Sequence, residues 1–260
     1  MAVSDAEIRS FHASIWKVGF GSVSADEAIF LRDVVDQANA KVVLELGTAT
    51  GLSGCFLIKF LDGRAGAYFR TVDTAQQFWN DKSKLTGYLI DDHIRSTNVD
   101  FAVMRGMSSI DTAKVLGGRK ADVIFIDANH QHPWPLIDTL LNLNHLAPTG
   151  IMVHHDLDLF RKQQVVRGIG PKYLFDQLPD ALKVVSPQAT NIYAFRHPGD
   201  INAFADLISD AFLLPWSNVQ PLDPAFVGHC QSYFAATYPG TKVVEKLNMG
   251  LSRFGQPAAA

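Results

Sequence analysis

Four residues in the middle of the chain have side chains that could do chemistry together. Asp127 and His130 are three residues apart, and His155 is followed directly by Asp156. An imidazole ring titrates near neutral pH and can accept a proton from a hydroxyl group, and a carboxylate can orient the ring. The same side chains can bind a divalent metal ion, although histidine is a poor Mg²⁺ ligand and suits Mn, Fe or Zn. These residues therefore predict an acid–base centre or a metal site.

A glycine-rich stretch nearer the N-terminus could bind a nucleoside. The segment 45–53 reads E-L-G-T-A-T-G-L-S. A P-loop would need Lys and then Ser or Thr after its last glycine, but Leu52 follows Gly51. A dinucleotide loop would need glycine where this chain has Ala49, and the carboxylate of Glu45 would repel a diphosphate. The stretch suits a ligand that lacks phosphate and carries positive charge.

Alternating strands and helices must position these residues. Val42–Leu44 is a short apolar run rich in β-branched residues, as in a buried parallel strand, and Leu52–Leu61 is apolar almost all round, as in a buried helix. The same criteria predict strands at 66–72, 100–104, 121–126, 151–153, 181–185 and 192–195, and a helix at 85–95. The alternation predicts a doubly wound α/β sheet, in which ligands bind beyond the carboxyl ends of the strands.

The N-terminal region contains a helix start that can be recognised from sequence. Ser24-Ala-Asp-Glu27 is a capping box, in which the serine and glutamate side chains satisfy each other's backbone amides. It predicts an amphipathic helix at 25–38. Ile8, Phe11, Ile15 and Trp16 have helical spacing, and Gly19-Phe-Gly21 would end that element.

Asp73 is placed to bind a sugar. It follows the strand predicted at 66–72 and comes one strand–loop–helix–strand unit after Glu45. A carboxylate at this position can accept hydrogen bonds from both ribose hydroxyls. The alternative is an ordinary turn aspartate at the end of a strand.

Two motifs resemble those of known O-methyltransferases. The string from Glu45 to Ser53 is similar to motif I of class I S-adenosylmethionine (SAM) methyltransferases, in the form found in catechol O-methyltransferase-like enzymes. Asp127-Ala-Asn-His130, followed by Ile151-Met-Val-His-His-Asp156, resembles the macrocin and cephalosporin-biosynthesis branch, methyltransferase family 24. The usual Pro-Gly-Gly turn is replaced here by Pro148-Thr-Gly150. The resemblance covers residues 20–197 and implies a Rossmann-like sheet of seven mostly parallel strands, with an antiparallel hairpin closing it.

The resemblance also implies roles for individual residues. Residues expected to bind SAM are Glu45, Gly47, Thr48, Gly51, Ser53, Asp73, Met107, Ser108 and Asp127, with Val23 and Ser24 as further contacts. His130 is expected to be the catalytic base, beside Asp127. In the related families Asp127 and the pair after strand five hold Mg²⁺. That pair is acidic, or Asp-Asn, in the families and is His155-Asp156 here, so a metal bound by Asp127, His155 and Asp156 could be Mg²⁺ or a transition metal.

The resulting hypothesis is a SAM-dependent O-methyltransferase that acts on a small hydroxylated metabolite, a sugar or a phenol. One alternative is a metal-dependent oxygenase on the same scaffold, with iron held by His130, His155 and one of the two aspartates. Another is a non-catalytic SAM-fold module that binds a partner through its C-terminal segment. We expect residues 1–199 to form the SAM-binding domain. Residues 200–260 are an aromatic-rich extension that packs on that domain or joins a partner subunit, for example in a homodimer.

The bulk properties exclude several classes. The 260 residues are 47% hydrophobic and can bury a full core, and the net charge of −3 with scattered basic residues gives no reason to expect nucleic acid. No apolar run reaches the roughly 18 residues that a transmembrane helix needs, and the N-terminus lacks the layout of a signal peptide. Cys55 and Cys230 have no metal-binding spacing. A cytoplasmic protein without a membrane partner is the expectation.

Overall fold

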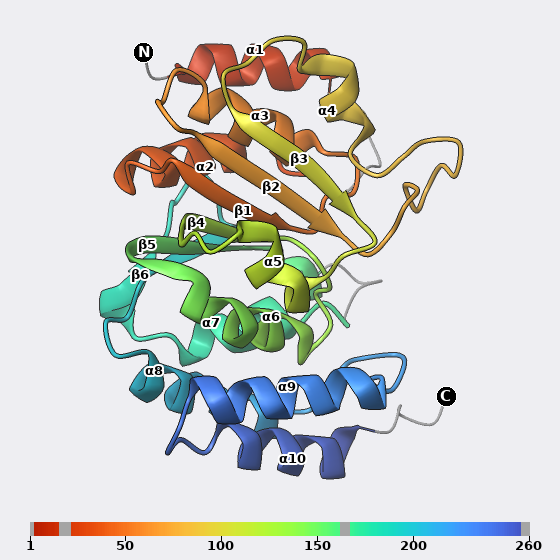
Figure 1. Ribbon diagram of the computed structural model, residues 1–260, viewed down its shortest axis with the longest axis vertical. Coiled ribbons are helices and arrows are strands. Elements are labelled where there is room, and N and C mark those ends of the chain that lie inside the picture. The colour runs from red at the N-terminus through yellow and green to blue at the C-terminus, as the bar shows by residue number, and fades with distance from the viewer. Residues whose placement is uncertain (1–2, 16–21, 162–166, 256–260) are drawn as a thin grey trace.

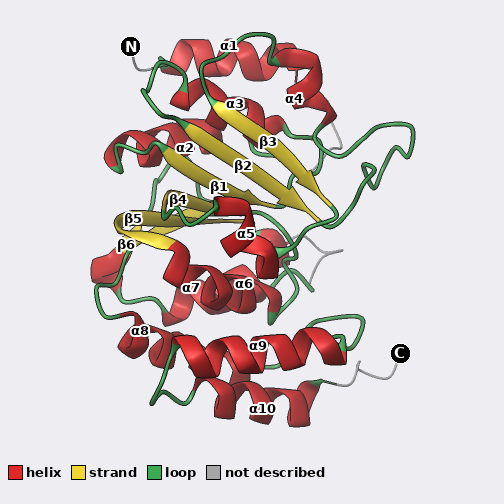
Figure 2. Ribbon diagram, in the orientation of Figure 1, coloured by secondary structure: helices red, strands yellow, loops and turns green. Residues whose placement is uncertain are grey.

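A seven-stranded sheet with helices on both faces forms the centre of the computed structural model, which describes residues 3–15, 22–161 and 167–255 (Figures 1 and 2). The strand order is β3-β2-β1-β4-β5-β7-β6. β7 runs antiparallel to both β5 and β6, and the other neighbours are parallel. The strands are β1 Val42–Leu46, β2 Tyr68–Asp73, β3 Asp100–Arg105, β4 Ala121–Ile126, β5 Leu146–His155, β6 Lys183–Val184 and β7 Ile192–Arg196. The predicted doubly wound, mostly parallel fold is confirmed.

The strand order reverses between β1 and β4, which lie side by side. Leu46 is paired with Ile126, so the residues that follow, Gly47 and Asp127, leave the sheet at the same level. Asp127 N donates to Leu46 O over 2.8 Å, and Gly47 N donates to Val72 O over 2.8 Å. The carboxyl ends of β2, β1 and β4 therefore meet at one edge, where such folds bind ligands.

Each face of the sheet is covered by its own set of helices, as Figure 1 shows. α1 Asp5–Ile15, α2 Ala25–Gln37, α3 Leu52–Leu61 and α4 Tyr88–His93 lie on one face, while α5 Thr112–Leu116, α6 Trp134–Asn142 and α7 Gly170–Gln177 lie on the other. Side chains alternate between two buried clusters, with Val43 in the first and Leu44 in the second. By this alternation Glu45 and His155 belong to the face of α2 and α3.

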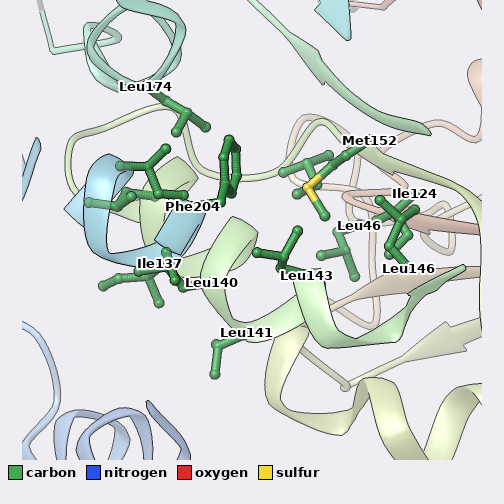
Figure 3. Close-up of a cluster of buried hydrophobic side chains, with 14 of the residues drawn as sticks. Leu46, Ile124, Ile137, Leu140, Leu141, Leu143, Leu146, Met152, Leu174 and Phe204 are labelled. Carbon is green, nitrogen blue, oxygen red and sulfur yellow. The ribbon is translucent and has the colours of Figure 1, made fainter. Parts of the chain in front are cut away.

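The C-terminal helices extend the second cluster. α8 Ile201–Ile208, α9 Pro224–Thr237 and α10 Val243–Phe254 follow β7, with a 3-10 helix at Ser209–Leu213. Phe204 packs with the leucines of α6 (Figure 3), and Phe234 and Tyr238 of the α9 region are fully buried in the same cluster. Tyr238 also donates a hydrogen bond to Leu140 O. Removing this segment would expose the outer face of α6.

Some element bounds differ from the predicted ones. β5 begins at Leu146 and not at residue 151. Its pairing with β4 jumps from Leu146 to Ile151, and the Pro148-Thr-Gly150 turn lies in a bulge within the strand. α4 is shorter than predicted because Gly87, at φ +79°, starts it. Glu45 lies inside β1 and does not follow it. The predicted break at 19–21, and Trp16, lie outside the described residues.

No helix among the described residues has both the length and the apolar character needed to cross a membrane.

Candidate active site

The glycine loop between β1 and α3 is pressed against the end of β4. Gly47 has a φ of +94°, and a Cβ there would lie 2.0 Å from Asp127 O, so only glycine fits. Gly51, at φ +87°, precedes the first turn of α3. The amides of Thr48 and Ala49 each donate to Asp73 Oδ2 over 3.1 Å. The loop is thus held between the ends of β2 and β4.

Asp73 makes hydrogen bonds with the loops that follow β1, β2 and β3. Its Oδ1 accepts from Ala75 N over 2.8 Å, and its backbone carbonyl accepts from Gly106 N and Met107 N, over 2.7 and 3.2 Å. Oδ2 therefore already accepts two backbone amides, while Oδ1 accepts one and keeps a lone pair for a sugar hydroxyl. The ribose-binding role predicted for Asp73 fits this place at the rim and stays a prediction.

The loop after β3 lies beside Asp73, as expected if Met107 and Ser108 bind SAM. Met107 is partly buried against the second core cluster, and Ser108 N donates to Asp111 Oδ2 over 2.9 Å at the start of a short helical turn. Of the two aromatic residues after β2, Phe78 is buried and Trp79 is exposed.

Glu45 is fully buried, and no described residue gives it a well-aligned hydrogen bond. Both of its carboxyl oxygens are out of contact with water, and Gly54 of α3 lies directly over the carboxyl group. Burial raises the pKa of Glu45 to about 8; the hydroxyls of Ser53 and Thr71 oppose the rise and the charges of Asp127 and Asp73 add to it. A buried acid without a partner, beside a glycine loop, fits a ligand that brings hydrogen-bond donors or positive charge.

Asp127 is the centre of a network with two histidines. Its Oδ1 lies 3.2 Å from His130 Nε2 and 3.1 Å from His155 Nδ1. His130 Nε2 is also 3.1 Å from Asp156 Oδ2. The structure thus brings together the four residues whose types first suggested chemistry. His130 is the accessible member, with a quarter of its side chain (25%) exposed.

His155 is buried and has a second carboxylate partner that the sequence did not suggest. Its Nε2 lies 3.3 Å from Glu27 Oε1, an ion-pair distance without the alignment of a hydrogen bond. Glu27 was predicted only as the capping residue of α2, a role it also fills. The sequence does not predict this contact, because Glu27 in the first turn of α2 and His155 at the end of β5 are far apart along the chain.

The charges in this network stabilise one another. Burial alone would lower the pKa of His155, but Asp127, Glu27 and Asp156 raise it well above its usual value. Burial would likewise raise the pKa of Glu27, yet the contact with His155 lowers it to about 2. The two histidines also outweigh burial at Asp127 and hold the pKa of that carboxyl well below its usual range. His155 is therefore a cation between two carboxylates.

Asp156 is held in an uncommon backbone conformation. Its φ is +62°, in the left-handed region that residues other than glycine rarely adopt. Asn191 Nδ2, from the residue just before β7, donates to Asp156 Oδ1 over 2.9 Å. This bond fixes the carboxylate whose other oxygen faces His130. Asn191 is a second residue of the site that sequence reasoning missed, since an isolated asparagine carries no motif.

The possible metal ligands differ from the predicted set. In the part of the chain that the structure describes, one group could hold an ion: Asp127, His130 and Asp156, with ligand atoms within 4.8 Å of one another. His155, predicted in this role, instead has each ring nitrogen facing a carboxylate. One imidazole and two carboxylates suit Mn, Fe or Zn better than Mg²⁺. The group does not have the two histidines that the oxygenase alternative requires.

Two neighbouring histidines have structural roles. His154 points to the opposite face of β5, where it stacks on Tyr193 with ring centres 5.4 Å apart and contacts Thr139 Oγ1 at 3.0 Å. This agrees with the alternation expected along a strand. His132 is buried, and its Nε2 lies 2.8 Å from Ala211 O. Its backbone N donates to Ser217 Oγ over 2.8 Å, so it joins the loop after β4 to the C-terminal segment.

Comparison with protein families gives a match for the central part of the chain. Residues 44–157 match a family whose description is "Methyltransferase domain". This range contains the glycine loop, Asp73, Asp127, His130 and the pair at the end of β5. A search of curated protein sequences gives no match.

Solved structures share the fold at low sequence identity. An O-methyltransferase from Bacillus cereus in complex with S-adenosylhomocysteine (SAH) is 18% identical, with 74% of this chain and 90% of that chain covered and a TM-score of 0.50. The O-methyltransferase TomG from Streptomyces achromogenes, involved in tomaymycin synthesis and solved with SAM, is 17% identical, with 74% and 88% covered and a TM-score of 0.50. A protein assigned as a caffeoyl-CoA O-methyltransferase from Staphylococcus aureus is 12% identical, with 74% and 92% covered and a TM-score of 0.52. Residues 44–157 therefore match a methyltransferase domain, and the chain shares its fold with these O-methyltransferases, as the sequence motifs predicted.

Proposed function

We propose that this chain, a methyltransferase of the class I fold, transfers the methyl group of SAM to a hydroxyl oxygen of a small metabolite, a sugar or a phenol. The observation that carries the proposal is the placement of His130. Its Nε2 contacts two carboxylates, at 3.2 and 3.1 Å, and one of them belongs to Asp127, whose backbone is pressed against the glycine loop. A histidine oriented in this way is a proton acceptor at the edge where this fold binds its ligands.

SAM suits the polar groups at the glycine loop. When bound, it supplies a methyl group on a positively charged sulfur, and transfer to an oxygen leaves SAH and releases the hydroxyl proton. Buried Glu45 needs a partner with donors or positive charge, and Asp73 at the rim can accept a ribose hydroxyl at Oδ1. The SAH and SAM in the Bacillus and Streptomyces structures support the same cofactor here.

The two ring nitrogens of His130 have different roles, because Nε2 faces two carboxylates and Nδ1 does not take part in those contacts. A proton on Nε2 can be shared with Asp127 and Asp156, which leaves Nδ1 with a free lone pair. Nδ1 then accepts the acceptor's hydroxyl proton as the oxygen forms its bond to carbon. The two carboxylates stabilise the imidazolium that results, as in other carboxylate–histidine pairs.

A divalent ion is a second aid that the donor set allows. Asp127, His130 and Asp156 would hold it, and it would lower the pKa of an acceptor hydroxyl. Removal of metal with EDTA separates this role from base catalysis. If turnover survives chelation, His130 alone removes the proton. If turnover is lost and then restored by Mn²⁺ but not by Mg²⁺, the ion also takes part in activating the hydroxyl.

The test of the function uses binding and turnover together. SAM should raise the melting temperature, since it binds only the folded state, and Asp73→Ala should reduce that rise. Incubation with SAM and a panel of sugars and phenols should yield SAH, measured by mass spectrometry. His130→Ala should lower the rate by about 10²- to 10⁴-fold and keep the SAM-induced shift. His229→Ala, at an exposed histidine of α9, is the matched control and should change neither.

Calorimetry can overturn the cofactor assignment. Heat on addition of NAD, with none for SAM or SAH, would refute it. Full turnover in His130→Ala would refute the base assignment and leave the cofactor untouched.

The proposal includes a setting for the protein. Both cysteines, Cys55 and Cys230, are free and buried, which suits a reduced, cytoplasmic compartment. The partner we propose is the small hydroxylated acceptor, with no nucleic acid and no membrane. A homodimer stays a prediction, which the sedimentation of the purified protein would test.

A further inference from the structure

Two α-helices in the described part of the chain begin with a Ser-x-x-Glu capping box, and the glutamate of only one of them reaches the candidate active site. At α1, Ser4 N donates to Glu7 Oε2 over 2.8 Å and Glu7 N donates back to Ser4 Oγ over 3.3 Å. At α2, Ser24 N donates to Glu27 Oε2 over 2.5 Å and Glu27 N donates to Ser24 Oγ over 3.3 Å. In both cases the cap needs one oxygen of the glutamate.

The second oxygen distinguishes the two glutamates. Glu7 is exposed at the surface. Glu27 is 7% exposed, and its Oε1 lies 3.3 Å from Nε2 of His155 at the end of β5. α2 thus sends a carboxylate from its first turn to the edge of the sheet where the site lies, and the cap fixes where that carboxylate sits.

The His155 ring is held at both nitrogens. Nδ1 lies 3.1 Å from Asp127 Oδ1 while Nε2 faces Glu27, and only 4% of the side chain is exposed. The ring cannot turn without losing both carboxylates. The orientation of the His155 ring also determines which oxygen of Asp127 faces the two histidines, because His130 contacts the same Oδ1. The hydrogen bonds to the Asp127 side chain from described residues all go to Oδ1, so Oδ2 is the oxygen left for a ligand.

We propose that Glu27 is a positioning residue for methyl transfer: it orients His155, and through it Asp127 and His130. The proposed role in turnover rests on the proposed function, while the orientation itself does not. The order of contacts runs from Glu27 Oε1 to His155, from His155 Nδ1 to Asp127 Oδ1, and from Asp127 Oδ1 to His130 Nε2. Helix α2 therefore determines the orientation of the Asp127 carboxylate at the end of β4.

Glu27→Gln separates positioning from capping. Glutamine has nearly the same size and also serves in capping boxes, so the start of α2 is kept. The charge that faces His155 is lost. A glutamine side chain has one oxygen, which cannot accept both the Ser24 amide and the N–H of the His155 ring. Glu7→Gln is the matched control, since it changes the same type of cap at a glutamate that is exposed at the surface. Glu27→Ala would remove the cap as well and is not needed.

The direct readout is the ring of His155. In full-length protein labelled with ¹⁵N-histidine, both ring N–H protons of His155 should exchange slowly with water in the unmodified protein and in Glu7→Gln. His155→Gln assigns these signals. In Glu27→Gln the Nε2–H signal should be lost to exchange, and the Nδ1–H signal should shift. Identical His155 ring signals in Glu27→Gln and the unmodified protein would overturn the proposal, as would the absence of slowly exchanging signals in the unmodified protein.

The kinetic readout distinguishes positioning from binding. With an acceptor found in the panel, Glu27→Gln should lower kcat at least tenfold while KM for SAM stays within twofold, and Glu7→Gln should change neither. An unchanged kcat in Glu27→Gln would refute a role in turnover. Failure of the unmodified protein to bind SAM would refute the proposed function instead, and the ring signals of His155 would still decide whether Glu27 orients it.

Discussion

Glu45 and Asp127 are acids on neighbouring strands with opposite ionisation. Glu45 lies in β1 and Asp127 follows β4, and both side chains are largely out of water. Burial raises the pKa of Glu45 to about 8, whereas two histidines hold the pKa of Asp127 well below its usual value in spite of burial. At neutral pH Glu45 is mostly protonated and Asp127 is ionised. Burial alone does not determine the charge of a carboxyl group; its partners do.

This difference divides the site into two parts. The Asp127 part has its counter-charges built in, from His155 and His130. The Glu45 part has no counter-charge of its own and would gain one from a bound cation. One part is thus complete before a ligand arrives, and the other is completed by the ligand. The comparison can be tested by replacing each acid with its own amide.

The largest expected effect is on stability. Asp127→Asn leaves the buried His155 cation with a neutral neighbour, and the loss of one partner of a buried pair costs about 3–5 kcal/mol of the free energy of unfolding. Glu45→Gln at pH 7 should leave that free energy unchanged or raise it, because the native glutamate is already protonated there. Urea denaturation of both variants measures the two values. Equal losses in both would show that the two acids do not differ in charge.

The second effect is the pH dependence that Glu45 adds. Its pKa is about 8 in the folded state and near 4.5 when unfolded, so between these values the folded state binds one more proton. The stability that Glu45 contributes is complete below the lower pKa and is lost as pH rises through the upper one. The unfolding free energy of the unmodified protein, relative to Glu45→Gln, should fall by at most about 1.4 kcal/mol per pH unit over that range. Parallel curves for the two proteins would contradict the raised pKa.

The smallest effect appears on binding. If SAM brings positive charge to Glu45, binding near pH 7 should release up to one proton from this residue. Calorimetry in two buffers with different ionisation enthalpies counts that proton. Glu45→Gln should abolish the release and weaken SAM binding by roughly tenfold, about 1.4 kcal/mol. Equal proton release in both proteins would assign it to another group.

Much of the fold could be predicted because its strands are locally distinct. The apolar runs of β1 and β4 are buried on both faces and need no long-range information to be recognised. The bulge in β5 could not be predicted, since Pro148 and Gly150 are typical of a strand end and only the pairing with β4 shows that the strand continues. For the C-terminal helices, the composition left open whether they pack on this chain or on another.

The site was predictable as a set of residues but not as a set of contacts. Motif spacing placed Asp127, His130, His155 and Asp156 at one edge, and the structure brings them together there. Which histidine faces which carboxylate depends on side-chain directions that no periodicity encodes. The contact between Glu27 and His155 joins two elements far apart in sequence. Each residue also has a local role, Glu27 in the capping box and His155 at the end of a strand, so neither signals the contact.

The hydrogen bonds of His132 give the C-terminal segment a part in the integrity of the site. His132 lies two residues after His130, and its amide, carbonyl and ring all contact residues between Ala211 and Ser217. A chain severed at the turn around Gly199 should therefore yield two fragments that are each incomplete. We expect catalysis to return only when both fragments are mixed, as in a split enzyme.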